Sequence, residues 1–325
     1  MIIKQMFNGL ALLALLVSLA ACTTSPAPQG GADASGGLSV VTTIFAPYDF
    51  ARAVTGGAAD LRMLLPPASE SHTYEPTPQD IIRIRECDVF IYVGGESDGW
   101  VETVLASVDA DSVRIITLMD CVEALEEEIV DGMEDDGGDG DGHDDDDDEP
   151  EYDEHVWTSP RNAKLIVQRI SDVICEADPA NADAYRQNTD AYLAELDSLD
   201  AAFQDAVDAG VRKTLVFGDR FPFRYLTEAY GLEYSAAFPG CSVNNEASAA
   251  TVKFLIQRIQ DGDIPVVLHI ELSNQKMAQT ISEETGAEVR LLHAVHNISS
   301  QDFTSGVTYL DLMRRNADVL REALG

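Results

Sequence analysis

Short apolar strands alternate with helical segments along most of this 325-residue chain, and this alternation limits the possible folds more than any other feature. The predicted strands are residues 38–45, 61–65, 89–93 and 114–118 in the first half and 214–217, 265–268 and 288–292 in the second. Continuous apolar strands joined by helices favour parallel sheets that are covered on both faces. The sequence therefore predicts an α/β fold.

Two helices separate the two groups of strands. Residues 160–177 have apolar positions at helical spacing, and a much longer helix is predicted from residue 179 to about residue 209. About 285 ordered residues are too many for one comfortable core. We therefore expect an N-terminal α/β lobe at 38–159, linking helices at 160–210 and a C-terminal α/β lobe at 211–325. A ligand would bind beyond the carboxyl ends of the strands.

The N-terminus has the features of an export signal. An apolar stretch at residues 10–21 is too short to span a bilayer and ends in Leu19, Ala20, Ala21 and Cys22. This ending resembles a bacterial lipobox, which predicts a signal peptide at 1–21, lipidation of Cys22 and a flexible tether at 22–37. The alternative is an ordinary secretory signal. Either way the protein is expected outside the cytoplasm, and the lipid would anchor it to the bacterial cell membrane.

The net charge of −36 argues against nucleic acid or anionic lipid as a partner. Residues 131–151 hold 13 of the 57 acidic residues, and such a tract cannot pack against itself at neutral pH. It is predicted to be a mobile loop inserted in the N-terminal lobe. It is either a solvated linker without a role or a weak collector of divalent cations, in which His143 could join.

Four cysteines remain after Cys22, and they are Cys87, Cys121, Cys175 and Cys241. Their wide spacing contains no C-x-x-C pair, which argues against a zinc site made by cysteines. The sequence leaves open whether they are buried thiols or form one or two disulfides.

Two of the six histidines lie beside turns that contain proline. His72 is followed by Pro76 and Pro78, and His155 is followed by Pro160. Imidazole suits zinc and other late first-row metals, and a loop stiffened by proline loses little entropy when it binds an ion. The two segments predict a metal site assembled across the chain. The alternative is that each histidine is a surface or capping residue.

These segments also resemble a known family, the metal-binding lipoproteins of zinc and manganese ABC transporters, called cluster A-I solute-binding proteins. The similarity runs from about residue 39 to the end of the chain, and the matching motifs are residues 41–47, 71–80, 91–94, 100–102, 153–157 and 308–313. The resemblance implies two α/β lobes joined by a long rigid helix, with the metal in the cleft between them. It also implies a mobile loop of acidic residues and histidine before the second ligand.

Carried over from the family, His72 and His155 fall on the first two ligand positions. The third position falls on Arg220, whose guanidinium cannot bind a cation, and the neighbouring Asp219 could supply an oxygen instead. The fourth position falls on Asn297, and the adjacent His296 is the better donor.

The expected site is therefore His72, His155, His296 and Asp219, a tetrahedral set suited to Zn²⁺, with Mn²⁺ or Fe²⁺ as the alternative cargo. Arg220 is expected to be a structural ion-pair partner, with Glu271 as the candidate acid.

The resemblance implies a carrier that captures a divalent metal, Zn²⁺ by preference, and delivers it to an ABC transporter permease. We expect a monomer that is not an enzyme, with metal release linked to movement of the lobes at the permease. A zinc hydrolase could use Glu75 or Glu154 as a base, but the sequence contains neither H-E-x-x-H nor a nucleophile elbow. A surface adhesin lipoprotein is the other alternative.

Overall fold

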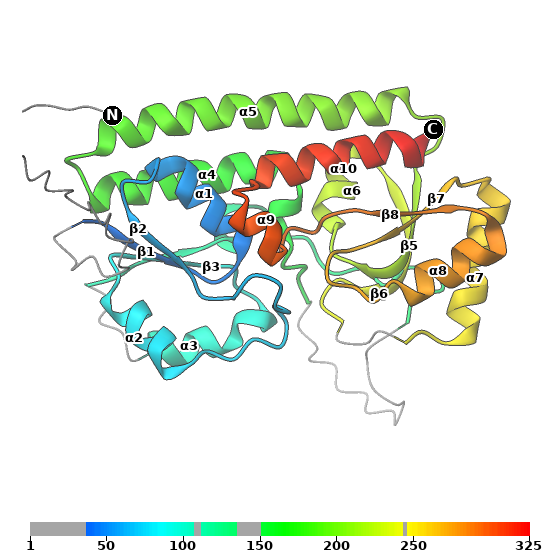
Figure 1. The fold of residues 1–325 in the computed structure, drawn as a ribbon, viewed down its shortest axis with the longest axis horizontal. Coiled ribbons are helices and arrows are strands. Elements are labelled where there is room, and N and C mark those ends of the chain that lie inside the picture. Colours follow the sequence, from blue (N-terminus) through cyan, green and yellow to red (C-terminus); the bar gives the residue numbers. More distant parts are fainter. Residues whose placement is uncertain (1–36, 107–111, 135–150, 243–245) are drawn as a thin grey trace, which may run out of the picture. The chain divides into compact units, whose positions relative to one another are not determined.

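The computed structural model describes residues 37–106, 112–134, 151–242 and 246–325. These residues form two four-stranded sheets in which all strands run parallel, as Figure 1 shows. The first sheet has the order β2-β1-β3-β4 and the second the order β6-β5-β7-β8. The α/β fold predicted from the sequence is confirmed.

The strand bounds are β1 Ser39–Thr42, β2 Asp60–Met63, β3 Val89–Tyr92, β4 Arg114–Thr117, β5 Thr214–Phe221, β6 Glu233–Pro239, β7 Val266–His269 and β8 Glu288–Leu291. The helix bounds are α1 Phe45–Thr55, α2 Pro78–Glu86, α3 Gly99–Leu105, α4 Pro160–Ala177, α5 Ala182–Ala209, α6 Arg224–Tyr230, α7 Ala249–Gly262, α8 Lys276–Thr285, α9 Ser300–Thr304 and α10 Tyr309–Leu324. Short 3₁₀ turns cover Glu96–Asp98, Met119–Cys121 and Val156–Thr158.

Helix starts follow the capping chemistry of the sequence. Thr77 accepts a hydrogen bond from the Asp80 amide and Asp80 accepts one from the Thr77 amide, so a capping box opens α2 with Pro78 in its first turn. Thr308 and Asp311 form the same box at the start of α10. These caps fix where the chain leaves the loops that follow β2 and β8.

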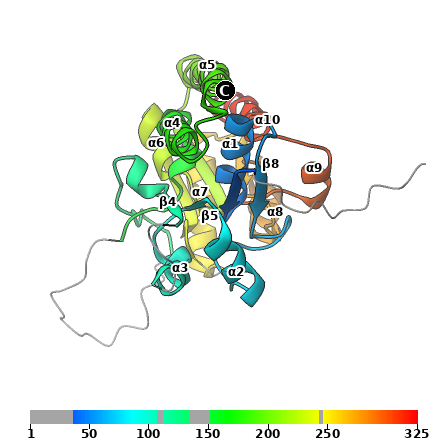
Figure 2. The same ribbon diagram turned by 90° about the vertical axis from the view of Figure 1, so that its left-hand side faces the viewer.

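Helix α5 is the longest element. Its 28 residues extend about 42 Å at roughly 1.5 Å per residue. The N-terminal half is here residues 37–159 together with α4, and the C-terminal half is residues 211–325. Helix α5 packs against α4 and α1 of the first and against α10 and α6 of the second. Figures 1 and 2 show α5 and α10 lying side by side. The largest cluster of buried apolar side chains is continuous through both halves.

The loops beyond the carboxyl ends of the two sheets meet. The Phe45 amide, just after β1, donates to the His296 carbonyl at 3.0 Å, and the Ala68 amide, after β2, donates to the Ile298 carbonyl at 2.9 Å. Trp157 is buried at this junction, and its indole N–H donates to the Ala294 carbonyl at 2.7 Å. A ligand held between these loops would touch both halves.

Strand β6 is not among the strands predicted from the sequence, which left residues 232–240 without an element. Its residues Ser235, Ala236 and Ala237 have weak strand preference, but the strand is buried beside β5 and pairs with it along its length. This pairing determines where the chain turns at Gly240. The four cysteines of the described residues are free thiols, so they form no disulfides. His143 and most of the acidic loop, residues 135–150, lie outside the described residues.

Candidate metal centre

His72 lies in the loop between β2 and α2. Its Nδ1 is 2.8 Å from the Ser97 hydroxyl, which comes from the turn after β3. This hydrogen bond holds one ring nitrogen at the wall of the site and leaves Nε2 as the second donor atom of the ring. Residue 70 of the same loop is tied to the C-terminal half, because Glu70 pairs with Arg220 at 3.2 Å.

His155 is completely buried just before α4. Its backbone N–H donates to Asp153 Oδ1 at 2.8 Å, and its Nδ1 donates to the same oxygen at 3.1 Å. A carboxylate can only accept when ionised, so the proton of the neutral ring sits on Nδ1 and the lone pair on Nε2. That Nε2 is buried and has no hydrogen-bond partner among the described residues.

His296 lies in the loop after β8. The Glu271 carboxylate, at the end of β7, accepts hydrogen bonds from the Ala294 amide at 2.7 Å and the His296 amide at 3.2 Å, which fixes the loop. The Nε2 of His296 is also buried and unpartnered within the described part of the chain. A buried polar atom without a partner costs free energy, so two such atoms at one place indicate an absent ligand.

The three histidines form one cluster. The ring centroids of His155 and His296 are 4.5 Å apart, those of His72 and His296 5.3 Å, and those of His72 and His155 5.9 Å. One ligand atom from each ring lies within 4.8 Å of the other two. Ligands about 2.1 Å from one tetrahedral Zn²⁺ are roughly 3.4 Å apart, so a small contraction of the cluster would complete three bonds.

The cluster opens into a narrow apolar cavity of ≈ 20 Å³, lined by His72, His296, Tyr74, Trp100 and Trp157 among others. This is room for about one water molecule or ion and not for an organic solute. Trp157 packs beside both buried rings, with its centroid 5.7 Å from His155 and 5.2 Å from His296. The cavity therefore has the size of a single ion, and the histidine rings supply its donor atoms.

Electrostatics keep two of the three rings neutral. Burial lowers the pKa of His72 to about 4, and the neighbouring His155 and Arg220 act in the same direction. Burial also places the pKa of His296 well below its usual range. Burial opposes the charged form of His155 too, but the Asp153 carboxylate outweighs it and raises the pKa of that ring. Neutral imidazole is the form that binds metal.

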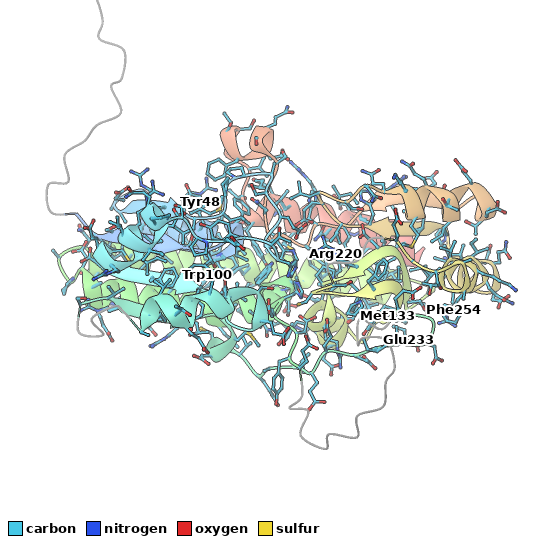
Figure 3. All side chains as sticks on the ribbon, turned by 90° about the horizontal axis from the view of Figure 1, so that it is seen from below. Tyr48, Trp100, Met133, Arg220, Glu233 and Phe254 are labelled. Carbon is cyan, nitrogen blue, oxygen red and sulfur yellow. The ribbon has the colours of Figure 1, made fainter. Side chains whose placement is uncertain are left out.

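Asp219 and Arg220 line a second cavity together with His72, but they do not join the histidine cluster. Asp219 belongs to neither group of possible metal ligands among the described residues, and its two carboxylate oxygens accept the backbone N–H groups of Arg220 at 2.9 Å and Ile270 at 3.2 Å. Arg220 is the structural ion-pair residue expected from the sequence, but its partner is Glu70 and not Glu271. Figure 3 labels Arg220 close to the loops of the N-terminal half.

Of the remaining histidines, His269 is buried at the end of β7, with Nδ1 2.9 Å from the Ile270 carbonyl. His293 is held by Asn316, whose side chain binds both its backbone N–H and its carbonyl at 2.7 Å. Neither belongs to a group of possible metal ligands within the described ranges. Cys22 lies outside the described residues, as does His143.

A second group of possible ligands was missed by the sequence analysis. His72, Glu154 and Cys241 offer ligand atoms that all lie within 4.8 Å of one another. Glu154 was considered only as the base of a hydrolase, and Cys241 only as a structural thiol. The turn Pro239-Gly240-Cys241 was the available signal, because glycine permits the close approach that brings the thiol to the cluster.

Comparison with known proteins gives a family match that covers the folded part of the chain. The sequence matches the family described as zinc-uptake complex component A, periplasmic, over residues 40–323. It is 31% identical over 322 residues to the high-affinity zinc uptake system protein ZnuA of Bacillus subtilis (strain 168), covering 98% of each chain. It is 29% identical over 289 residues to the zinc-binding lipoprotein AdcA of Streptococcus pneumoniae (strain ATCC BAA-255 / R6), covering 89% of this chain and 56% of that protein.

Among solved structures, the fold is similar to the Zn(II)-bound ZnuA-like domain of Streptococcus pneumoniae AdcA. The TM-score is 0.73 at 28% sequence identity, covering 89% of this chain and 99% of that domain. Within the described residues, no helix is both long enough and apolar enough to cross a membrane.

Proposed function

The chain belongs to the family of zinc-uptake complex component A, periplasmic proteins, and from this membership we propose that it captures Zn²⁺ outside the cytoplasm and delivers it to the permease of an ABC transporter. The family consists of solute-binding proteins and not of enzymes. The observation that carries the proposal is the cluster of three histidines with two buried, unpartnered Nε2 atoms.

We propose His72, His155 and His296 as the ligands that hold the ion. Three neutral imidazoles favour zinc over manganese, which prefers oxygen ligands. The Nδ1 hydrogen bonds of His72 and His155 to Ser97 and Asp153 support this role, because such contacts orient a ring for metal binding. Asp219 is not part of the proposed set, since it belongs to neither group of possible ligands among the described residues.

The site is built from both halves, which suits capture followed by release. His72 and His155 come from the N-terminal half, whereas His296 comes from the C-terminal half. A small separation of the meeting loops would remove one of three donors and weaken binding. We propose that contact with the permease causes this separation.

Lipidation at Cys22 would hold the carrier at the membrane, and we propose that it acts as a monomer. The motif Leu19-Ala20-Ala21-Cys22 supports the anchor, and a zinc-binding relative is itself described as a lipoprotein. Metabolic labelling with a fatty acid, compared between the natural chain and Cys22→Ala, tests the anchor. Equal labelling of both chains would exclude it.

Metal-free protein titrated with Zn²⁺ and Mn²⁺ in parallel tests the main proposal. We expect one tight equivalent of zinc, a clear rise in melting temperature and loss of both in His155→Ala. Selective binding of Mn²⁺ would keep the family and change the cargo. A protein that binds neither metal would refute the proposal and favour the adhesin alternative.

A further inference from the structure

His72 belongs to two groups of possible ligands. One contains His155 and His296, and the other contains Glu154 and Cys241. We infer that the second group is a transit position for the metal ion, from which zinc passes to the three histidines by ligand exchange around His72. This inference rests on the proposed zinc-binding function.

Glu154 is held in place for this role. Its side chain is 96% buried, since only 4% of its surface is exposed, and its Oε1 accepts the Ser97 amide hydrogen at 2.8 Å. A Cβ at Gly95 would lie 2.4 Å from that oxygen, so only glycine allows the carboxylate to approach the turn this closely. A carboxylate has capacity for further bonds after accepting one hydrogen, so it can also bind a cation.

Ser97 joins the two donors on the N-terminal side of the group. Its backbone N–H binds Glu154, and its hydroxyl lies 2.8 Å from Nδ1 of His72. One residue therefore fixes the spacing between the carboxylate and the ring. Ser97 is a positioning residue for both groups, because His72 is common to them.

Cys241 reaches the site from the C-terminal half on the turn after β6. The Gly240 amide donates to Glu127 Oε1 at 3.1 Å, and a Cβ at Gly240 would lie 2.8 Å from Cε1 of His155. The turn thus packs directly on the ring of a proposed ligand. Cys241 is half-buried like His296, and Glu154 is buried like His155, so the two groups are equally accessible.

The charge around the thiol suits a cation. The carboxylates of Glu154, Asp153 and Glu127 all act electrostatically on Cys241, and they attract the ion to the same place. A Zn–S bond forms when the ion displaces the thiol proton to solvent.

His72 cannot complete both groups at once. While His72 stays bound to the zinc ion, Cys241 and Glu154 can be replaced one after the other by Nε2 of His155 and Nε2 of His296. Zinc tolerates the brief fifth ligand that such an exchange requires. The buried, unpartnered Nε2 of His155 provides the destination. A thiolate in the second group also disfavours Mn²⁺.

The test uses Co²⁺ as a probe, because a cobalt–thiolate bond absorbs in the near ultraviolet and cobalt–imidazole bonds do not. His296→Ala weakens the group of three histidines, so the ion is expected to stay in the second group and give a stable thiolate band at one equivalent. Adding Cys241→Ser to this variant should abolish the thiolate band and weaken Co²⁺ binding at least about tenfold. This is the lower end of the loss of metal affinity that follows a change around the ligands. Adding Cys121→Ser, another half-buried thiol, should change neither.

The outcomes separate this inference from the proposed function. If wild-type protein binds zinc but His296→Ala shows no thiolate band, or the band survives Cys241→Ser, the transit position is wrong and the zinc site stands. If wild-type protein binds neither Zn²⁺ nor Co²⁺, the proposed function itself fails. His296→Asn, which keeps a polar side chain, serves as the trapping variant if the alanine variant does not fold.

Discussion

Replacing Asp153 by asparagine isolates the contribution of one carboxylate to metal affinity. Asp153 Oδ1 binds both the backbone N–H and Nδ1 of His155, and the Asp153 residue is only 1% exposed. An amide can still accept these hydrogen bonds but carries no charge, so it holds the ring less firmly and makes Nε2 a weaker donor. Changes of this kind lower metal affinity about 10- to 100-fold, or about 1.4 to 2.7 kcal/mol.

The assay is competition for Zn²⁺ against a chromogenic chelator, with melting of the metal-free proteins measured in parallel. Asp49→Asn is the matched control, because Asp49 is equally buried and accepts the Tyr309 amide at 2.7 Å but is not a member of the cluster. It should lower stability without changing zinc affinity. Zinc affinity of Asp153→Asn within about twofold of wild type would refute the reasoning, as would an equal loss in Asp49→Asn.

Three other predictions concern the same junction. Zinc affinity should fall by roughly tenfold per pH unit below the raised pKa of His155, because one proton competes with zinc for that ring while the other two rings stay neutral. In a chelator titration, a slope near three for the logarithm of zinc affinity against pH would contradict this. Gly240→Ala should lower the melting temperature and weaken the free energy of zinc binding by about 1–3 kcal/mol, because the new Cβ meets the His155 ring, whereas Gly99→Ala, where space is open, should change neither. Trp157→Phe should reduce the free energy of unfolding in urea by about 1–3 kcal/mol, because the Ala294 carbonyl loses its donor; an unchanged urea midpoint would show that this hydrogen bond contributes nothing.

The sequence predicted the parts of the molecule that depend on local pattern. Apolar runs identified β1, β3 and β7, whose residues are almost all buried. His72 and His155 were predicted from the turns beside them, His296 was added through the family resemblance, and the structure brings the three together in one cluster. Their role as ligands remains a prediction.

The parts that failed depend on contacts between distant residues. Arg220 pairs with Glu70, 150 positions away, and no local pattern distinguishes this acid from Glu271. Cys241 reaches His72 only because β6 pairs with β5, and β6 itself was missed. The prediction erred where pairing between strands, and not the preference of a segment, decides the outcome.

Helix α5 has a consequence for how metal affinity relates to stability. It contacts helices of both halves, and the apolar cluster beneath it is continuous across them. Moving the halves apart would expose this buried apolar surface, at a free-energy cost of about 25 cal/mol per Å². The donors are therefore brought near one another when the chain folds, and only a small contraction of the cluster remains when the ion arrives. Scattering profiles with and without zinc should differ little, and substitutions in α5 far from the histidines should lower stability while the folded protein keeps its zinc affinity.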